Sequence, residues 1–408
     1  MSPLILLGDL APLDLRTITI APSGALPASA LTLANLEVPC CPAHLAPRAK
    51  AGPQLRADPA ILPVLAAAWP GLAVTLANNH SMDFGAAGLA ATLTAATAAG
   101  LRPFGAGPTH AAAAAPLVLT LGGLRVGLLA ATERWFGLAT ADTPGVCALD
   151  PATVDRVRSL RPTVDRVIVA IHGGGEMSPW PAPAWQQTLR GLISAGADVV
   201  HAHHPHVPLG WERWQHGWIF YGLGNTVVNP TRWTQSPAVR RSWRAQFDLS
   251  RLDAAPAVSE WECFSEGDAG GELRCIRPSV TADEPAVAEL NLPLADPLLL
   301  EGLHQEYALR LWDHFYADRL NLGDTAARRV RLAARTLRDA ALALLSPERS
   351  RRQRRDRGLF HYHLFSSGTH AGEIATALGV LHGERVDRRT PRTRVLAERW
   401  LPAVHFAG

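Results

Sequence analysis

Cysteine, excess charge and long hydrophobic runs are all scarce in this sequence. The five cysteines form no Cys-x-x-Cys pair and leave one over, so neither a zinc knuckle nor a disulfide framework is indicated. The formal net charge is only +3, which does not require a nucleic-acid partner. The first apolar run stops at Gly8-Asp9 without a preceding basic segment, too early for a signal peptide or a membrane span. We therefore expect a protein of the reducing cytoplasm with no nucleic-acid or membrane partner.

Apolar residues, in contrast, are plentiful enough for a large core. Of the 408 residues 48% are hydrophobic, which suits one large domain with a smaller one. Short apolar runs that end in polar residues recur through the first two thirds of the chain, and each is typical of a buried strand. From residue 285 the chain is rich in leucine, alanine and arginine with few turn signals. We expect an α/β domain over 1–284 and a helical region over 285–408.

Polar side chains follow several of the predicted strands. They are Asp9, Glu37, Asn78, Asn79, His80, Asp83, His172, Glu176, His201, His203, His204, His206 and Asn225. A satisfied core or loop role explains any one of them as well as a function does. If the strands share one sheet system and one direction, however, their ends converge on a single site. The number of such residues therefore favours a functional site.

The stretch VVHAHHPHVPLG (199–210) holds four of these histidines within six positions. Neutral imidazoles often bind a metal, but histidines also serve as proton-transfer groups around a substrate. The stretch alone leaves both interpretations open.

The helical region has one clear apolar stripe and one basic run. Helical spacing places Leu300, Leu303, Tyr307, Leu311 and Phe315 on one face. His304 and His314 fall on the same stripe, so both are predicted to point inward. The basic run 346–357 is interpreted as a solvated helix face or loop, since this is the commoner explanation of such runs.

Six motifs, in this order along the chain, resemble those of the CapA, or poly-gamma-glutamate capsule protein, family. They are GDL (8–10), NLEVP (35–39), LANNHSMDFGAAGL (76–89), AIHGGGE (170–176), AGADVVHAHHPHV (195–207) and IFYGLGN (219–225). The family belongs to the calcineurin-like metallophosphoesterases, and the resemblance covers roughly residues 4–230. It implies a sandwich of two mixed β-sheets flanked by helices for the domain 1–284. The site-lining residues that it implies are Asp9, Glu37, Asn79, His80, His172, Glu176, His204, His206 and Asn225.

Several positions depart from the two-metal pattern of that superfamily. Ala11 stands where a D-x-H motif would have its histidine, Glu37 replaces a bridging aspartate, and the third motif begins at Asn78 as NNH in place of GNHE. Nitrogen and oxygen ligands for Mn, Fe or Zn nevertheless remain. In this interpretation the metal ligands are Asp9, Glu37, Asn79, His172, His204 and His206. The alternative, with no metal and no other cofactor, stays open.

Family members without a membrane anchor also occur as tailoring enzymes of ribosomal peptides, including lasso-peptide precursors. The resemblance implies that these invert the C-terminal residue of the peptide without a metal. Inversion needs two acid-base groups that flank the α-carbon, and donors that stabilise the charge as it forms. Our first hypothesis is accordingly a cytosolic epimerase of a precursor peptide. Its two bases are Asp9 and His304, and its donors include His172 and His204.

The substrate-binding residues of this hypothesis are Glu37, Asn79, His80, Glu176, His206, Asn225, Trp180 and Trp211. Of twelve tryptophans, eight lie between residues 180 and 261. Core packing explains most of them, but Trp180 and Trp211 follow the His172 and His206 motifs and are expected to line a peptide groove.

Two further hypotheses compete with the epimerase. One is a metal-dependent phosphoesterase or a poly-gamma-glutamate-related hydrolase, which requires a bound transition metal. The other is a binding protein on a degenerate phosphatase scaffold. The sequence identifies neither the substrate nor the oligomeric state.

Overall fold

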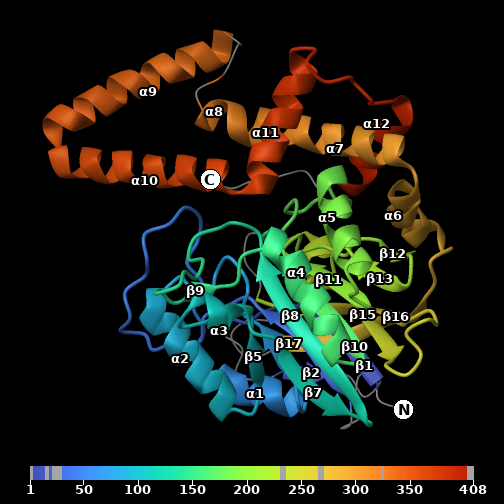
Figure 1. The fold of residues 1–408 in the computed structure, drawn as a ribbon. Coiled ribbons are helices and arrows are strands. Elements are labelled where there is room, and N and C mark those ends of the chain that lie inside the picture. Colours follow the sequence, from blue (N-terminus) through green and yellow to red (C-terminus); the bar gives the residue numbers. More distant parts are fainter. Residues whose placement is uncertain are drawn as a thin grey trace. The chain divides into compact units, whose positions relative to one another are not determined.

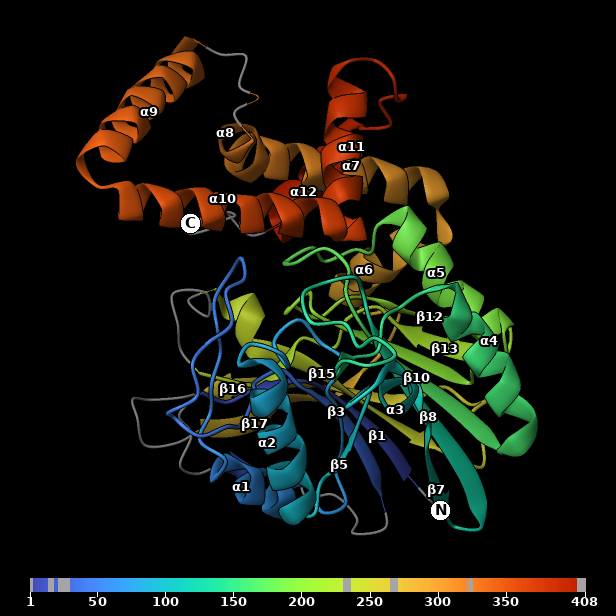
Figure 2. The ribbon, with the colours of Figure 1, turned by 60° about the vertical axis from the view of Figure 1, so that its left-hand side comes forward.

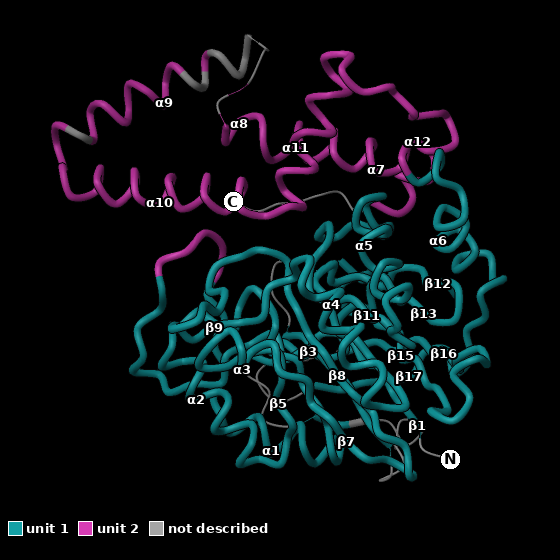
Figure 3. Tube along the Cα trace, viewed as in Figure 1, with its two compact units in different colours: residues 1–48, 54–300 teal, residues 49–53, 301–408 magenta. Residues whose placement is uncertain are grey.

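The chain divides into two compact units (Figure 3). A computed structural model describes residues 3–13, 18–20, 30–229, 236–264, 271–320, 322 and 326–401. Unit 1 comprises residues 1–48 and 54–300, and unit 2 comprises residues 49–53 and 301–408. Helix α6 (Pro285–Ala295), which the sequence assigned to the C-terminal region, belongs to unit 1.

The first sheet of unit 1 is built around β1 (Pro3–Ala11), whose residues are all buried. Its strand order is β2-β17-β16-β15-β1-β3-β4-β5, and β14 pairs with β1 in addition. The other strands are β2 (Ile18–Ile20), β3 (Leu31–Leu36), β4 (Ala73–Thr75), β5 (Arg102–Phe104), β14 (Asn225–Val228), β15 (Arg241–Asp248), β16 (Ala257–Phe264) and β17 (Gly271–Val280). Strands β3 and β14 run parallel to β1, whereas β15 runs antiparallel. The apolar run over residues 31–36 is thus a buried strand, as expected for such runs.

Gly8 lies where β1 changes its partner from β15 to β14. The first four residues of β1 pair with β15, and the strand pairs with β14 from Asp9 onward. A Cβ atom at Gly8 would stand 2.0 Å from the carbonyl oxygen of Gly224, so only glycine fits this close approach. The next backbone N–H, that of Asp9, donates to the same carbonyl at 2.8 Å. Asp9 is therefore the first residue of β1 that pairs with β14, opposite Asn225.

The second sheet has the strand order β12-β13-β11-β10-β8-β7. Its strands are β7 (Leu117–Leu121), β8 (Leu124–Thr132), β10 (Arg166–His172), β11 (Val199–His203), β12 (Trp211–Trp214) and β13 (Gly217–Phe220). The four inner strands are parallel, and the edge strands β7 and β12 are antiparallel to their neighbours. Strands β7 and β8 form a hairpin around Gly122-Gly123. A short ladder joins β6 (Ala106–Gly107) to β9 (Gly145–Val146).

Helices cover both sheets of unit 1 (Figures 1 and 2). They are α1 (Ile61–Ala68), α2 (Gly85–Ala98), α3 (His110–Ala114), α4 (Pro151–Leu160) and α5 (Pro183–Ser194). Leu62 of α1 and Leu89 of α2 share one core with the first sheet, while Val157 of α4 and Leu189 of α5 share another with the second. Burial of these apolar faces holds the layers together. The predicted fold class, two mixed sheets flanked by helices with a helical C-terminal region, is confirmed.

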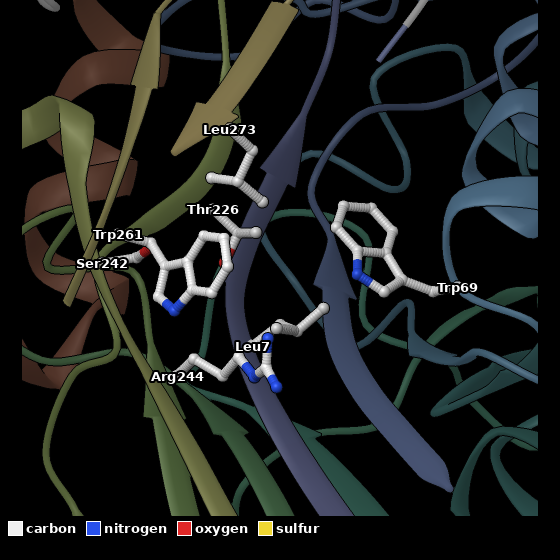
Figure 4. A pocket seen from close by; sticks show the side chains of 7 residues that line it. All are labelled: Leu7, Trp69, Thr226, Ser242, Arg244, Trp261 and Leu273. Carbon is white, nitrogen blue, oxygen red and sulfur yellow. The ribbon is translucent and has the colours of Figure 1, made fainter. Parts of the chain in front are cut away.

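A small hollow lies among the strands of the first sheet (Figure 4). It is lined by Leu7, Trp69, Thr226, Ser242, Arg244, Trp261 and Leu273. The guanidinium carbon of Arg244 lies 5.2 Å from the centroid of the Trp261 ring, a cation–π distance. Burial lowers the pKa of Arg244. None of these residues is among the predicted site residues.

Unit 2 is helical in its described parts. Its helices are α7 (Pro297–Leu311, shared with the end of unit 1), α8 (Ala317–Arg319), α9 (Ala326–Leu345), α10 (Pro347–Ser366), α11 (Gly368–Leu381) and α12 (Pro391–Trp400). The core contains Tyr307, Trp312, Leu364 and Ala377. The basic run 346–357 falls on α10, where most of its arginines are exposed. Within the described ranges, no helix combines the length and the apolar character needed to cross a bilayer.

The prediction that His314 points inward is wrong. The helix continues from α7 into a π-helical turn over Trp312–Tyr316, which widens the turn and shifts the phase of the residues on it. His314 is therefore exposed, whereas Trp312 and Tyr316 are buried. His304, which precedes the π turn, does point inward, with a side chain 9% exposed.

Candidate metal centre

The predicted convergence of strand ends is observed in unit 1. His172 and His203 end β10 and β11, Asp9 lies two residues before the end of β1, and Glu37 directly follows β3. Asn79, Glu176, His204 and His206 lie in the loops that follow, and Asn225 begins β14. β1 runs parallel to β3 in the first sheet and β10 parallel to β11 in the second, so each sheet presents its polar carboxyl ends together. The contacts between Asp9 and His203 and between Glu37 and His172 show that the two sets meet.

Asp9 is a buried carboxylate surrounded by donors. Its Oδ1 accepts a hydrogen bond from Asn35 Nδ2 at 2.9 Å and lies 2.8 Å from His203 Nδ1. Its Oδ2 lies 3.5 Å from His206 Nδ1. Burial alone would raise the pKa of Asp9, but the nearby His203 and His206 outweigh burial and lower it. Asp9 is therefore ionised at neutral pH.

Glu37 belongs to two overlapping groups of potential metal ligands. One group is Asp9, Glu37 and His172, and the other is Glu37, His204 and His206. In each group the ligand atoms lie within 4.8 Å of one another. Glu37 Oε1 is 3.5 Å from His172 Nε2 and 3.7 Å from His206 Nε2. Glu37 would therefore serve as a ligand in either group.

His172 is buried and neutral. Its Nε2 lies 3.0 Å from Asn79 Oδ1, so the amide oxygen of Asn79 faces the same space as Glu37. Burial, and then the other histidines around it, hold the pKa of His172 well below its usual value. A neutral imidazole is the form that binds a metal.

His206 and Glu176 form the more accessible wall of the site. His206 Nδ1 lies 3.1 Å from Asn225 Oδ1, and its Nε2 is 4.0 Å from Glu176 Oε1. Burial opposes the protonation of His206, but Glu37, Asp9 and Glu176 outweigh it and raise the pKa of His206 to about 9. Burial raises the pKa of Glu176 to about 7. Without a cation this wall therefore carries a protonated imidazole.

The loop after β11 holds its histidines in an unfavourable backbone conformation. His204 has a φ of 96° and His206 a φ of 59°, and Met177 in the neighbouring loop has a φ of 60°. Non-glycine residues with positive φ are uncommon, and they persist where the surroundings impose them. The His204 ring lies 5.0 Å from the His172 ring and 5.7 Å from the His206 ring, measured between centroids. The imposed conformation thus directs both imidazoles into the cluster.

Not every predicted site residue belongs to this cluster. His80 Nδ1 lies 2.9 Å from Asp83 Oδ2, and the His80 charge acts on His172 without a direct bond to it. His304 lies in unit 2, where its Nε2 is 3.3 Å from Thr376 Oγ1. Its pairing with Asp9 stays a prediction.

The expectation that Trp180 and Trp211 line a groove is wrong. Trp180 is 4% exposed and donates from Nε1 to the carbonyl of Glu289 at 3.3 Å. Trp211 is 6% exposed and stacks on Phe220, with ring centroids 5.7 Å apart. Both rings therefore pack into the body of unit 1, as large apolar side chains generally do.

Two residues of the site were given no role by the sequence interpretation. Asn35 contacts Asp9, and His203 contacts both Asp9 and His201, whose Nδ1 lies 3.0 Å from His203 Nε2. The alternation of side chains along a strand was the available signal, since Asn35 is two positions before Glu37 and so shares its face.

The donor set fits a divalent transition metal. Carboxylate oxygens and neutral imidazole nitrogens are the ligands that Mn, Fe and Zn accept, and both groups offer them within a short span. Asp9, Glu37, His172, His204 and His206, five of the predicted ligands, make up these two groups. Asn79 lies beside them through its contact with His172. The expectation of a site without a metal draws no support from these contacts.

Solved structures resemble the chain at low sequence identity. One is a 5'-nucleotidase precursor from Thermus thermophilus, with 14% identity, a TM-score of 0.36, and coverage of 73% of this chain and 59% of that one. Another is a hypothetical protein from the same organism, with 17% identity, a TM-score of 0.35, and coverage of 67% of this chain and 99% of that one.

Two curated relatives are named CapA. The capsule biosynthesis protein CapA of Bacillus anthracis is 32% identical over 170 residues, which is 40% of this chain and 41% of that protein. The PGA biosynthesis protein CapA of Bacillus subtilis is 32% identical over 193 residues, which is 45% of this chain and 50% of that protein. The match spans half or less of the length of these relatives.

The family model described as bacterial capsule synthesis protein PGA_cap matches residues 17–230. This range is more than half of the 408 residues, and it contains the loops and strand ends that supply Glu37, Asn79, His172, His204 and His206. The chain therefore belongs to the PGA_cap family of bacterial capsule synthesis proteins.

Proposed function

We propose that the protein is a metal-dependent hydrolase, with a phosphoester as its first candidate substrate. The observation that carries the proposal is the pair of ligand groups that share Glu37, one with Asp9 and His172 and one with His204 and His206. A divalent metal at such a site polarises a phosphoryl oxygen and makes water a better nucleophile at neutral pH.

The residues of the chain have separate roles in this proposal. Asp9, Glu37 and the three histidines would hold the metal, and Asn79 would supply an amide oxygen beside them. Glu176 is the proton donor to the leaving group, because burial raises its pKa to about 7 and keeps part of it protonated at neutral pH. It lies beside His206, so it faces the same space as the ligand atoms.

A γ-glutamyl amide is the second candidate substrate. The family description and the Bacillus relatives concern capsule and PGA biosynthesis, and a polymer of that kind offers amide bonds with a free carboxylate beside each. A metal that activates water and polarises a carbonyl oxygen serves amide hydrolysis by the same principles.

The test is a metal and activity measurement on the purified full chain. We expect bound Mn, Fe or Zn by elemental analysis, hydrolysis of p-nitrophenyl phosphate or its diester, and loss of both after chelation. Poly-γ-glutamate is assayed in parallel. Glu37→Gln should lose metal and activity together, while His216→Asn, a change at an exposed histidine, should retain both. A chain that binds no added metal would overturn the proposal.

The peptide-epimerase hypothesis has no support from the relatives and stays a prediction. It requires incorporation of deuterium at the α-carbon of a precursor peptide's C-terminal residue in the presence of chelator. The same purified chain can be used for this deuterium assay and for the hydrolysis assays, so one set of measurements distinguishes an epimerase from a hydrolase.

A further inference from the structure

Asn35 is a fully buried amide in the middle of the ligand groups. Its Nδ2 donates to Asp9 Oδ1 at 2.9 Å and lies 3.5 Å from Glu37 Oε2. The same nitrogen is 3.3 Å from His172 Nδ1. One side chain on β3 therefore contacts a residue of β1, a residue of β10 and the carboxylate that both ligand groups share.

The orientation of the Asn35 amide follows from its neighbour Asn78. Asn78 Oδ1 accepts from the backbone N–H groups of His80 at 3.0 Å and Ser81 at 2.9 Å, so this atom must be the oxygen. Asn78 Nδ2 then donates to Asn35 Oδ1 at 3.0 Å and to the carbonyl of Leu36 at 2.9 Å. The Asn35 oxygen faces Asn78, and its NH2 group must face the carboxylates.

This orientation divides the oxygens of the two carboxylates. Asn35 holds Asp9 Oδ1 and approaches Glu37 Oε2. His203 Nδ1 also lies 2.8 Å from Asp9 Oδ1, so Asn35 and His203 hold the same oxygen. The second oxygen of each carboxylate faces a potential metal-binding histidine, with Asp9 Oδ2 3.5 Å from His206 Nδ1 and Glu37 Oε1 3.5 Å from His172 Nε2. Donors on one oxygen fix the carboxylate plane and leave the second oxygen directed at the ligand cluster.

We propose that Asn35 is a positioning residue of the metal centre, which sets the directions of Asp9 and Glu37 and is itself set by Asn78. The inference rests on the proposed function, because it concerns how that site is held for its cation. Groups that hydrogen-bond metal ligands orient them and typically change metal affinity by about 10- to 100-fold.

The experiment measures metal affinity, by competition with a chromophoric chelator, on full-length wild type and Asn35→Ala with Mn²⁺ and with Zn²⁺. We expect affinity to fall about 10- to 100-fold in the variant. Asn35→Ser, which keeps a polar group but is too short to reach both carboxylates, should show the same loss and serves if the alanine variant does not fold. Gln186→Ala is the matched control. Gln186 is a buried amide of unit 1 that donates to the carbonyl of Leu294 at 2.9 Å, so its loss should lower stability and leave metal affinity unchanged.

A double-mutant cycle tests the path through Asn78. Asn78→Ala should weaken metal binding in the wild type and have little further effect in the Asn35→Ala background, because Asn78 acts by orienting Asn35. If wild type binds metal and Asn35→Ala and Asn35→Ser bind it equally well, the inference is overturned. If the two losses are additive, the route through Asn78 is overturned. If wild type itself binds neither metal, the proposed function fails instead.

Discussion

Acidification should destabilise unit 2 through the buried histidine His304. Burial and the nearby Arg385 lower the pKa of His304 to about 4, although Glu373 Oε2 lies 3.6 Å from its Nδ1. The folded state therefore holds this imidazole neutral, while the unfolded chain binds a proton with the ordinary histidine pKa of 6.5. Stability is complete above pH 6.5 and is lost as the pH falls from there toward 4, because the unfolded state binds the proton first.

The size of the effect follows from the two pKa values. Linkage between a folded pKa of about 4 and an unfolded pKa of 6.5 gives a loss of about 2 kcal/mol at pH 5 from His304 alone. Burial likewise lowers the pKa of His363 to about 4 and of His370 to about 3, so wild-type unit 2 should lose more than this. His304→Gln keeps a hydrogen-bonding group near Thr376 and removes the titration.

Amide hydrogen exchange of peptides from α7 and α11 measures this loss within unit 2. Wild type and His304→Gln are compared at the same pH, which cancels the intrinsic pH dependence of exchange. Between pH 7 and pH 5 the opening free energy of wild type should fall by about 2 kcal/mol more than that of the variant. His314→Gln, at an exposed histidine close by, should behave as wild type. If the opening free energies of wild type and His304→Gln fell equally between pH 7 and pH 5, the reasoning would be refuted. His304 would then be able to take up a proton in the folded state, with Glu373 as its partner.

Further predictions concern the stability of both units, and chemical denaturation with a circular dichroism signal checks them. Asp150→Ala removes the capping box of α4 and should cost about 1 kcal/mol, and no change would mean that the cap is not formed in solution. Arg190 donates to both Glu212 oxygens, at 2.7 and 2.8 Å. Glu212→Ala removes this partner of a largely buried cation and should lower the free energy of unfolding by about 3 kcal/mol, more than the loss of an exposed ion pair would. Leu337→Ser should stay within about 0.5 kcal/mol because that side chain is 73% exposed, whereas Leu364→Ala at a fully buried position should cost about 3 kcal/mol. Similar costs for the two leucines would show that α9 is covered in solution.

Polar residues at strand ends were the most informative part of the sequence. Asp9 and His172 could be located because each comes at the carboxyl end of an apolar strand. Asn225 was found by the apolar run before it, although the structure places it at the start of β14. Asn35 escaped notice because it lies inside β3, where a polar residue looks like an interruption of the strand. Strand alternation places Asn35 on the face of Glu37, but only the fold shows that this face meets Asp9 and His172.

Other features depend on geometry that no local pattern reports. The helical spacing of α7 correctly predicts that His304 points inward, but its prediction for His314 is wrong. The π turn adds a residue per turn, and the spacing of apolar residues in the sequence does not reveal it. Trp180 and Trp211 lie close in sequence to site loops, yet the chain turns their rings into the core. Proximity along the chain is a poor guide where loops reverse direction within a few residues.

The positive-φ residues of the site have a consequence for how this protein responds to selection. His204 and His206 hold conformations that glycine or asparagine would adopt at lower cost, a difference of about 1 kcal/mol or more at each position. A library screened for heat resistance alone should therefore enrich such replacements and discard the imidazoles. The most heat-resistant variants would then lose the metal-binding histidines first. Thermostability and metal binding must therefore be screened together when this scaffold is engineered.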